Sequence, residues 1–247
     1  MPLFASNDDL VRSRLLKLGK TFTSENKPKS ILVISAHYET GPSILVTSAS
    51  QPEMYFDYYG FPKEAYNFKY SAPGNPKLAH QVKDLLTGSN IPCELDPKRG
   101  FDHGVFVPLM LAFPNADIPV ITLSLHKSFD PTTHIRIGEA LQPLRTEGVL
   151  IIGSGMSFHN MTPAMRSSSK FFGRDFDKAL VEVMKKNPQD RNNILKEWFN
   201  LPGARNAHAR EEHLLPLLVV AGVAGESIGK ADSFKAMKAY ISGFAFE

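Results

Sequence analysis

The stretch Ile31-Leu-Val-Ile-Ser-Ala-His37 is a run of apolar and small residues that ends in a histidine. Its length and its branched aliphatic residues predict a buried strand. A second apolar run, Val149-Leu-Ile-Ile-Gly-Ser154, is followed by His159. Open α/β sheets bind ligands beyond the carboxyl ends of their parallel strands, so both imidazoles are expected at one edge of a sheet. The pattern predicts a metal site or an acid–base site at that edge.

Strand signals and helix signals alternate along the chain. Apolar runs predict strands at residues 31–36, 91–95, 118–125 and 149–153, and the alternating tail 238–246 resembles an edge strand. Helical periodicity is seen at residues 8–20, 76–87, 105–113, 132–146, 171–186, 191–199 and 212–221. This order predicts a single α/β domain over residues 1–247, with a mostly parallel central sheet flanked by helices.

Two of the expected helices carry N-terminal capping signals. Ser6 or Asn7 is expected to cap the helix at residues 8–20, and Asn75 is expected to cap the helix at residues 76–87. Side chains of this type accept hydrogen bonds from the first free N–H groups of a helix, which favours a helix start at both places.

Residues 50–74 interrupt the alternation of strands and helices. They hold five of the seven tyrosines, together with prolines and glycines that prevent long regular elements. A long aromatic segment of this kind is typical of a folded flap or a binding loop. We expect the tyrosines of residues 55–70 to wall a pocket and to stack on an aromatic ligand.

Composition excludes several classes of protein. A hydrophobic content of 43% with 21% charged residues excludes a disordered chain, and a net charge of +3 favours no nucleic-acid partner. No apolar stretch approaches the roughly 20 residues of a membrane helix, and no signal peptide is visible at the N-terminus. The single cysteine, Cys93, excludes an internal disulfide, so we expect a cytoplasmic location and a metal held by nitrogen and oxygen.

Several histidines favour a structural interpretation. His80 lies among polar residues of an expected helix and is interpreted as solvated, while His134 and His126 are interpreted mainly as structural or supporting residues. His208 and His213 would lie about 140° apart on a helix, so at most one of them is expected to bind a metal. We favour His213, because the apolar run 214–220 follows it.

His37, His159 and His103 each have two interpretations. His37 and His159 fit either a hydrogen-bonded core histidine or a functional residue, and the glycines of Gly153-Ser-Gly155 favour function for His159 by allowing close backbone approach. Asp102 precedes His103 and is expected either to orient that imidazole or to cap the helix that follows. None of these spacings matches a strong metal-binding pattern on its own.

Taken in order, seven segments resemble one known family. The chain resembles the class III extradiol ring-cleaving dioxygenases, in the 4,5-DOPA extradiol dioxygenase branch. The similarity extends over nearly the whole chain and is carried by Ser35-Ala-His-Tyr38, Tyr59-Gly-Phe-Pro62, Tyr70-Ser-Ala-Pro-Gly74, Gly100-Phe-Asp-His-Gly104, Pro114-Asn-Ala-Asp-Ile-Pro119, Gly153-Ser-Gly155 with His159-Asn160, and Glu212-His-Leu-Leu-Pro-Leu217.

The resemblance implies a set of site residues and a cofactor. It implies that His37 and His213 are metal ligands, and that His159 lies at the metal either as an acid–base residue or as a further ligand when zinc occupies the site. It also implies that His103 assists proton transfer beside the substrate. The implied metal is Fe(II) for ring cleavage, with Zn(II) possible in the same site. The implied reactants are a small catechol resembling DOPA and O2, and the sequence predicts no oligomeric state.

The chemistry of the expected reaction suits these residues. Neutral imidazoles bind iron or zinc and leave positions open for exchangeable ligands. A catechol bound to a cation loses its protons more easily, and a nearby histidine that titrates near neutrality can accept one of them.

One family motif is not seen in this sequence. In the family an N-terminal strand ends in His-Gly-Ser-Pro, whose histidine is a further ligand, whereas this sequence starts Met1-Pro-Leu-Phe4. We therefore expect the strand that carries His37 to border an open slot in the sheet. The alternative function is a non-catalytic protein that binds a metal or an aromatic ligand on the same scaffold, and a zinc hydrolase is a weaker third possibility.

Overall fold

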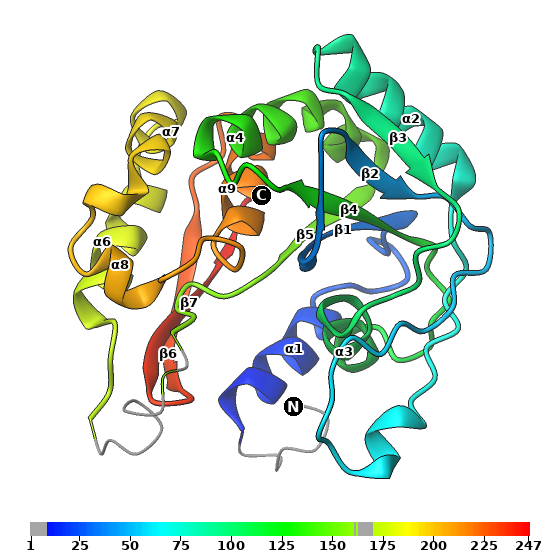
Figure 1. Cartoon of the computed structure of the whole chain (residues 1–247), viewed down its shortest axis with the longest axis horizontal. Coiled ribbons are helices and arrows are strands. Elements are labelled where there is room, and N and C mark those ends of the chain that lie inside the picture. Colours follow the sequence, from blue (N-terminus) through cyan, green and yellow to red (C-terminus); the bar gives the residue numbers. More distant parts are fainter. Residues whose placement is uncertain (1–8, 161, 163–169) are drawn as a thin grey trace. The chain divides into compact units, whose positions relative to one another are not determined.

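The computed structural model describes residues 9–160, 162 and 170–247. The chain forms two compact units (Figure 1). Unit 1 comprises the described residues of Met1–Lys127 together with Pro143–Ser154, and unit 2 comprises Ser128–Gln142 and the described residues of Gly155–Glu247. A 3-10 turn at Gln142–Glu147 connects unit 2 back to unit 1.

Unit 1 is built on a five-stranded sheet. The strand order is β3 (Cys93–Asp96), β2 (Ile44–Thr47), β4 (Val120–His126), β1 (Ser30–Thr40) and β5 (Val149–Ser154). β1 is parallel to both β4 and β5, and β2 is parallel to β3. β2 is antiparallel to β4 through the pair Val46 and Leu123. The predicted mostly parallel α/β sheet is confirmed.

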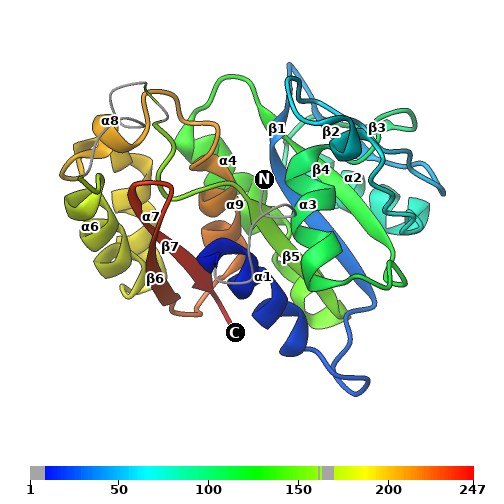
Figure 2. The same cartoon turned by 90° about the horizontal axis from the view of Figure 1, so that it is seen from below.

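Three helices flank this sheet. Viewed in Figures 1 and 2, α2 (Pro76–Gly88) lies on one face, and α1 (Leu10–Lys20) and α3 (His103–Ala112) lie on the other. Asn75 caps α2 by accepting from the N–H of Leu78 at 3.0 Å, as predicted. α1 is capped by Asp9 rather than by Ser6 or Asn7, which lie outside the described residues.

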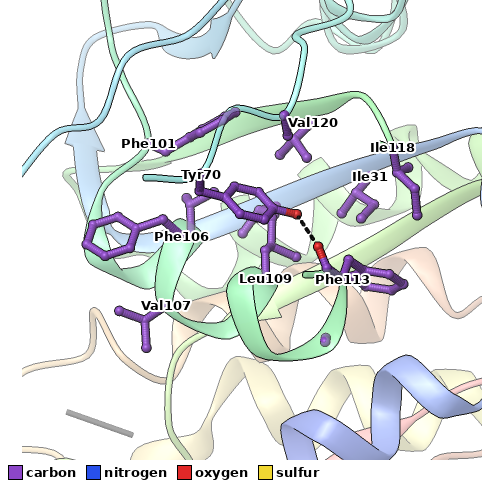
Figure 3. Close-up of a cluster of buried hydrophobic side chains, with 13 residues drawn as sticks. Ile31, Tyr70, Phe101, Phe106, Val107, Leu109, Phe113, Ile118 and Val120 are labelled. Atoms are coloured by element: carbon purple, nitrogen blue, oxygen red, sulfur yellow. Dashed lines mark hydrogen bonds between the residues drawn. The ribbon is translucent and has the colours of Figure 1, made fainter. Parts of the chain in front are cut away.

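The core of unit 1 forms between α3 and the sheet, as Figure 3 shows. Phe101 and Phe106 are completely buried there against Ile31 of β1. The Tyr70 hydroxyl donates to the carbonyl of Phe113 at 3.1 Å, which satisfies a buried polar group. Full burial of each large apolar side chain stabilises the fold by about 1.5–3 kcal/mol. This packing fixes the start of α3, where His103 lies.

Unit 2 combines helices with a hairpin. Its helices are α4 (Pro131–Ala140), α6 (Arg174–Met184), α7 (Pro188–Lys196), the short α8 (Ala204–Ala207) and α9 (Leu215–Val223). α4 and α9 pack closely because a Cβ at Gly138 or Gly222 would collide with a backbone carbonyl of the other helix. β6 (Lys230–Ala236) and β7 (Ala239–Ala245) form an antiparallel pair, and short 3-10 turns occupy Lys63–Tyr66 of unit 1 and Trp198–Asn200 of unit 2.

Some details of the prediction are wrong. The strand that carries His37 does not border an open slot, because β1 has β4 on one side and β5 on the other. His37 lies within β1 rather than beyond its end, and the pairing of β1 with β4 shifts register between Ile34 and Glu39. The tail strand 238–246 pairs with β6, which the sequence analysis missed because most residues of β6 are polar and exposed.

Two further observations concern the division into domains and the character of the helices. The single domain over residues 1–247 stays a prediction, since the two units are each compact. Among the described residues, no helix combines the length and the apolar character that a bilayer crossing requires.

Candidate functional site

His37 is held through its main chain near the end of β1. Its N–H donates to the hydroxyl oxygen of Ser35 at 3.2 Å, and its carbonyl accepts from the Arg99 guanidinium at 3.0 Å. The ring contacts a second histidine of unit 1, His103, with 4.0 Å between ring centroids. A Cβ at Gly104 would lie 2.9 Å from His37 Cδ2, so the small residue after His103 makes room for this ring contact.

Asp102 supports His37 rather than His103. Its carboxylate is completely buried and accepts from the Ser35 hydroxyl at 2.8 Å and from Arg99 at 3.2 Å. The Arg99 guanidinium lies over the rings of Tyr38 and Tyr55, at 4.6 Å and 4.2 Å from their centroids. Asp102 occupies the N-cap position of α3, as one interpretation expected, but its side chain makes no capping hydrogen bond. The other interpretation is wrong, because the carboxylate is bonded to Ser35 and Arg99 and not to the His103 ring.

His103 is held instead by Asp57. One oxygen of Asp57 lies 2.8 Å from Nδ1 of the His103 ring and also accepts the main-chain N–H of His103 at 3.0 Å. Burial alone would raise the pKa of Asp57, but the hydrogen bonds from the ring and the main chain of His103 outweigh burial and lower that pKa. Asp57 is thus a carboxylate at neutral pH.

The aromatic segment packs beside this pair. The Tyr58 ring meets the His103 ring edge to face at 5.8 Å, and Phe56 contacts Phe106 of α3 at 5.8 Å. Tyr66 lies 5.4 Å from Tyr58, so residues 55–70 form a continuous aromatic surface next to His103. The role of residues 55–70 as a substrate wall stays a prediction.

In unit 2, His159 and His213 stack face to face. Their ring centroids are 3.6 Å apart and their planes differ by 20°. The N–H of His159 donates to the carbonyl of Ala207 at 3.0 Å, and the N–H of Met156 donates to the carbonyl of His213 at 2.9 Å. A Cβ at Gly155 would collide with that same carbonyl of His213. The glycine turn therefore allows the close backbone approach predicted from the sequence.

Glu212 completes the cluster in unit 2. Its carboxylate lies 3.8 Å from Nδ1 of His159 and 4.0 Å from Nε2 of His213, and Arg210 lies 3.6 Å away on the other side. Burial lowers the pKa of His159, although the charge of Glu212 opposes this shift. His159 is therefore a neutral imidazole at neutral pH, the form that carries a lone pair for a metal.

Each unit thus offers a group of three donor atoms. The donors of His37, Asp57 and His103 lie within 4.8 Å of one another, and so do those of His159, Glu212 and His213. Nitrogen and carboxylate oxygen donors of this kind fit iron or zinc. The shared metal site of His37, His159 and His213 stays a prediction, since His37 belongs to unit 1 and the other two belong to unit 2.

Comparison with known proteins identifies the family of this chain. The family described as "Catalytic LigB subunit of aromatic ring-opening dioxygenase" matches residues 12–245. The chain belongs to this family. Its members depend on a metal, so the chain is a metal-dependent extradiol ring-cleaving dioxygenase, and the resemblance found in the sequence is confirmed.

Named relatives agree with membership of the LigB family. The 4,5-DOPA dioxygenase extradiol of Beta vulgaris is 42% identical over 230 residues, which cover 92% of this chain and 84% of that protein. Dioxygenase tasH of Hapsidospora irregularis is 39% identical over 229 residues, covering 86% of this chain and 69% of that protein. The crystal structure of the uncharacterized protein JW3007 from Escherichia coli K12 has a TM-score of 0.75 at 28% identity and covers 97% of this chain and 93% of that chain.

The remaining histidines of this LigB family member have structural surroundings. His208 is completely buried, and its Nε2 lies 3.1 Å from the carbonyl of Ser157. His134 is completely buried with Nδ1 2.8 Å from the carbonyl of Asp130, and His80 is exposed. His126 lies 3.2 Å from the carbonyl of Pro42. The stronger burial of His208 than of His213 differs from the prediction, which placed His213 deeper.

Sequence reasoning missed two acidic residues of this family member. Asp57 lies among aromatic residues of a loop, where no spacing links it to His103. Glu212 precedes His213 directly, so its adjacency to a predicted ligand was the only available signal.

Proposed function

We propose that this dioxygenase opens the ring of a DOPA-like catechol next to its hydroxyl groups and incorporates O2 into the product. We further propose that His37, His159 and His213 hold Fe(II), and that Zn(II) can occupy the same site. The stacked pair of His159 and His213 beside Glu212, in a chain of this family, is the observation that carries the proposal. Relatives named 4,5-DOPA dioxygenase extradiol support the substrate class.

The donor set suits this metal. His159 is neutral at neutral pH because burial lowers its pKa, and both rings of the stacked pair lie next to a carboxylate. Bound Fe(II) would supply a Lewis acid that eases loss of the catechol protons and would bring the two reactants to one point. Neutral imidazoles leave such an ion electron-poor enough to serve that role.

The side chains of this protein would then orient the substrate and move its protons. His103 would accept the proton of a catechol hydroxyl on its ring nitrogen Nε2 and return it later. His159 would serve as a second acid–base group in the state in which its lone pair is not bound to the metal. The aromatic surface formed by Phe56, Tyr58 and Tyr66 would stack on the ring and exclude water from it.

Oxygen uptake tests this function directly. The purified chain is loaded with Fe(II) without air, and L-DOPA and then O2 are added. We expect oxygen uptake together with a yellow semialdehyde product that absorbs visible light. If several catechols give no oxygen uptake while iron is shown to be bound, the proposal is wrong.

We also propose a cytoplasmic location. The thiol of Cys93 is buried, and burial raises its pKa to about 11, so it stays protonated and unreactive. A chain whose single cysteine needs no oxidising environment suits a reducing compartment. Fractionation of cells that express the tagged full chain would check this location.

A further inference from the structure

We propose that Asp57 is a positioning residue that sets the tautomer of His103 and so makes Nε2 the nitrogen that accepts the substrate proton. The hold of Asp57 on the ring stands on geometry alone. The catalytic consequence rests on the proposed function.

The hydrogen bonds of Asp57 define the tautomer. A carboxylate has no proton to donate, so the Nδ1 nitrogen that lies 2.8 Å from Asp57 must carry the proton itself. In the neutral form of the ring, the other nitrogen, Nε2, then keeps its lone pair. The same carboxylate oxygen accepts the main-chain N–H of His103 at 3.0 Å, so ring and backbone are tied to one atom. This double contact fixes both the tautomer and the direction of the ring.

The neighbouring rings restrict His103 further. The His37 ring lies 4.0 Å away and the Tyr58 ring meets it edge to face at 5.8 Å. The side chain of His103 nevertheless remains 30% exposed, whereas that of Asp57 is only 12% exposed. The imidazole is therefore held at Nδ1 by a largely buried carboxylate, and the rest of the ring stays accessible to a small molecule.

Main-chain pairing delivers Asp57 to this position. The N–H of Tyr55 donates to the carbonyl of Phe101 at 2.8 Å, and the N–H of Phe101 donates to the carbonyl of Glu53 at 2.8 Å. Gly100 allows this approach, because a Cβ there would collide with the carbonyl of Glu53. The segment that bears Asp57 is thus fastened to the residues that immediately precede His103.

Two other roles would use the same contacts. Asp57 could act only as a helix cap, since its oxygen accepts the first N–H of α3. It could also be a metal ligand, since its oxygen and the ring nitrogens of His37 and His103 lie within 4.8 Å of one another. A cap affects stability, a ligand affects metal content, and a positioning residue affects the tautomer, so the three roles have different readouts.

The experiment compares two substitutions of Asp57 with a matched control. Asp57→Asn keeps an oxygen that can accept from Nδ1, and Asp57→Leu has a similar shape without any acceptor. Asp9→Leu removes the corresponding cap of α1, where the Asp9 carboxylate accepts from the N–H of Arg12 at 2.8 Å and no histidine is bonded. The full chain, loaded with diamagnetic Zn(II) and labelled with nitrogen-15, is studied by NMR at alkaline pH. Its His103 signals are assigned by their loss in His103→Gln.

We expect separate effects on the His103 tautomer, measured by NMR, and on kcat, measured by oxygen uptake. Wild type and Asp57→Asn should show a protonated Nδ1 and an unprotonated Nε2 in His103, and Asp57→Leu should shift the proton toward Nε2. With Fe(II) and a catechol, kcat of Asp57→Leu should fall about 10–100-fold with little change in KM, and Asp57→Asn should recover part of it. Asp9→Leu should change neither the tautomer nor kcat.

Two outcomes would overturn the proposal. An unchanged His103 tautomer in Asp57→Leu would show that the carboxylate does not set it. Loss of bound metal in Asp57→Leu, in proportion to lost activity, would make Asp57 a ligand instead. If wild type turns over no catechol but the tautomer still changes in Asp57→Leu, the proposed function fails while the hold of Asp57 on His103 stands.

Discussion

The two histidine pairs of this protein are supported in different ways. In unit 1, hydrogen bonds of 2.8–3.2 Å that involve Asp57, Asp102 and Arg99 hold His37 and His103. In unit 2, the carboxylate of Glu212 lies 3.8 Å from Nδ1 of His159 and 4.0 Å from Nε2 of His213. The backbone around that second pair is positioned through main-chain carbonyls.

This difference suggests a division of roles. A short hydrogen bond to a carboxylate occupies one ring nitrogen and leaves the other to exchange a proton. Two stacked imidazole rings with a carboxylate 3.8–4.0 Å away bring together nitrogen and oxygen donors of the kind that bind a cation. We therefore expect substitutions in unit 2 to remove metal, and substitutions of His103 to remove proton transfer while leaving metal in place.

The largest effect is expected from His213→Ala. It removes one of the two stacked donors in unit 2, so both bound metal and ring-cleaving activity should fall below detection. Metal analysis by mass spectrometry and oxygen uptake measure the two effects. The control is His80→Ala, a substitution of an exposed histidine. Full metal content in His213→Ala would show that the histidine pair of unit 2 is not the metal-binding pair.

The substitution His103→Gln should lower activity about 100-fold to 10,000-fold without loss of metal. Glutamine has a similar length but cannot accept and return a proton. Steady-state oxygen uptake and metal analysis on the same sample provide the test. Parallel loss of iron would instead assign His103 to metal binding and remove the distinction between the two pairs.

The stability of unit 2 should fall as the pH becomes acidic. Burial lowers the pKa of His208 to about 4 from the ordinary value of 6.5, even though the carbonyl of Ser157 accepts a hydrogen bond from it. Between these values the unfolded chain binds a proton that the folded chain does not, so stability falls as pH drops from 6.5 toward 4. The loss attributable to His208 should reach about 3 kcal/mol.

Urea denaturation over this pH range measures that loss. His208→Gln keeps an N–H for the carbonyl of Ser157 but does not titrate, so its stability should depend less on pH than that of wild type. An identical pH dependence in the two proteins would show that the protonation of His208 does not govern the stability of unit 2.

A smaller effect is expected at the charged support of His37. Asp102→Asn keeps the shape of the side chain but removes the charge that strengthens the bonds from Ser35 and Arg99. The free energy of unfolding should fall by about 2 kcal/mol, measured by urea denaturation. Asp117 forms an exposed ion pair with Lys27, and Asp117→Asn should cause no measurable change in the free energy of unfolding. Equal effects of both substitutions would mean that burial of Asp102 adds nothing.

The central strands could be predicted from local patterns because β1 and β4 are almost entirely buried. Their runs of branched aliphatic residues have few alternatives to a central strand. The edge strand β5 is only partly buried, but its run Val149–Ser154 has a similar composition. β6 lacked this signal, since its side chains are mostly polar. β2 was not predicted, because its run of four residues, Ile44–Thr47, is short. Its antiparallel direction relative to β4 was hidden too, because a strand pattern carries no sign of the direction of its neighbour.

The site could be predicted only in part. His37, His159 and His213 lie next to apolar runs or within recognisable motifs, so sequence alone marked them. Asp57 reaches His103 over a separation of 46 residues in sequence, through a pairing between loops. Asp102, although adjacent to His103, points to Ser35 and Arg99, because a residue that starts a helix directs its side chain independently of the next one.

The bridge between Met54 and Phe101 also governs how this protein tolerates changes in length. Asp57 lies three residues after Met54, and His103 lies two residues after Phe101, so both spacings from the bridge are short. One residue inserted between Tyr55 and Asp57 would misalign the carboxylate with the imidazole. An engineered insertion in the exposed turn at residues 59–60 leaves both spacings intact, because this turn follows Asp57 and precedes the buried Tyr70.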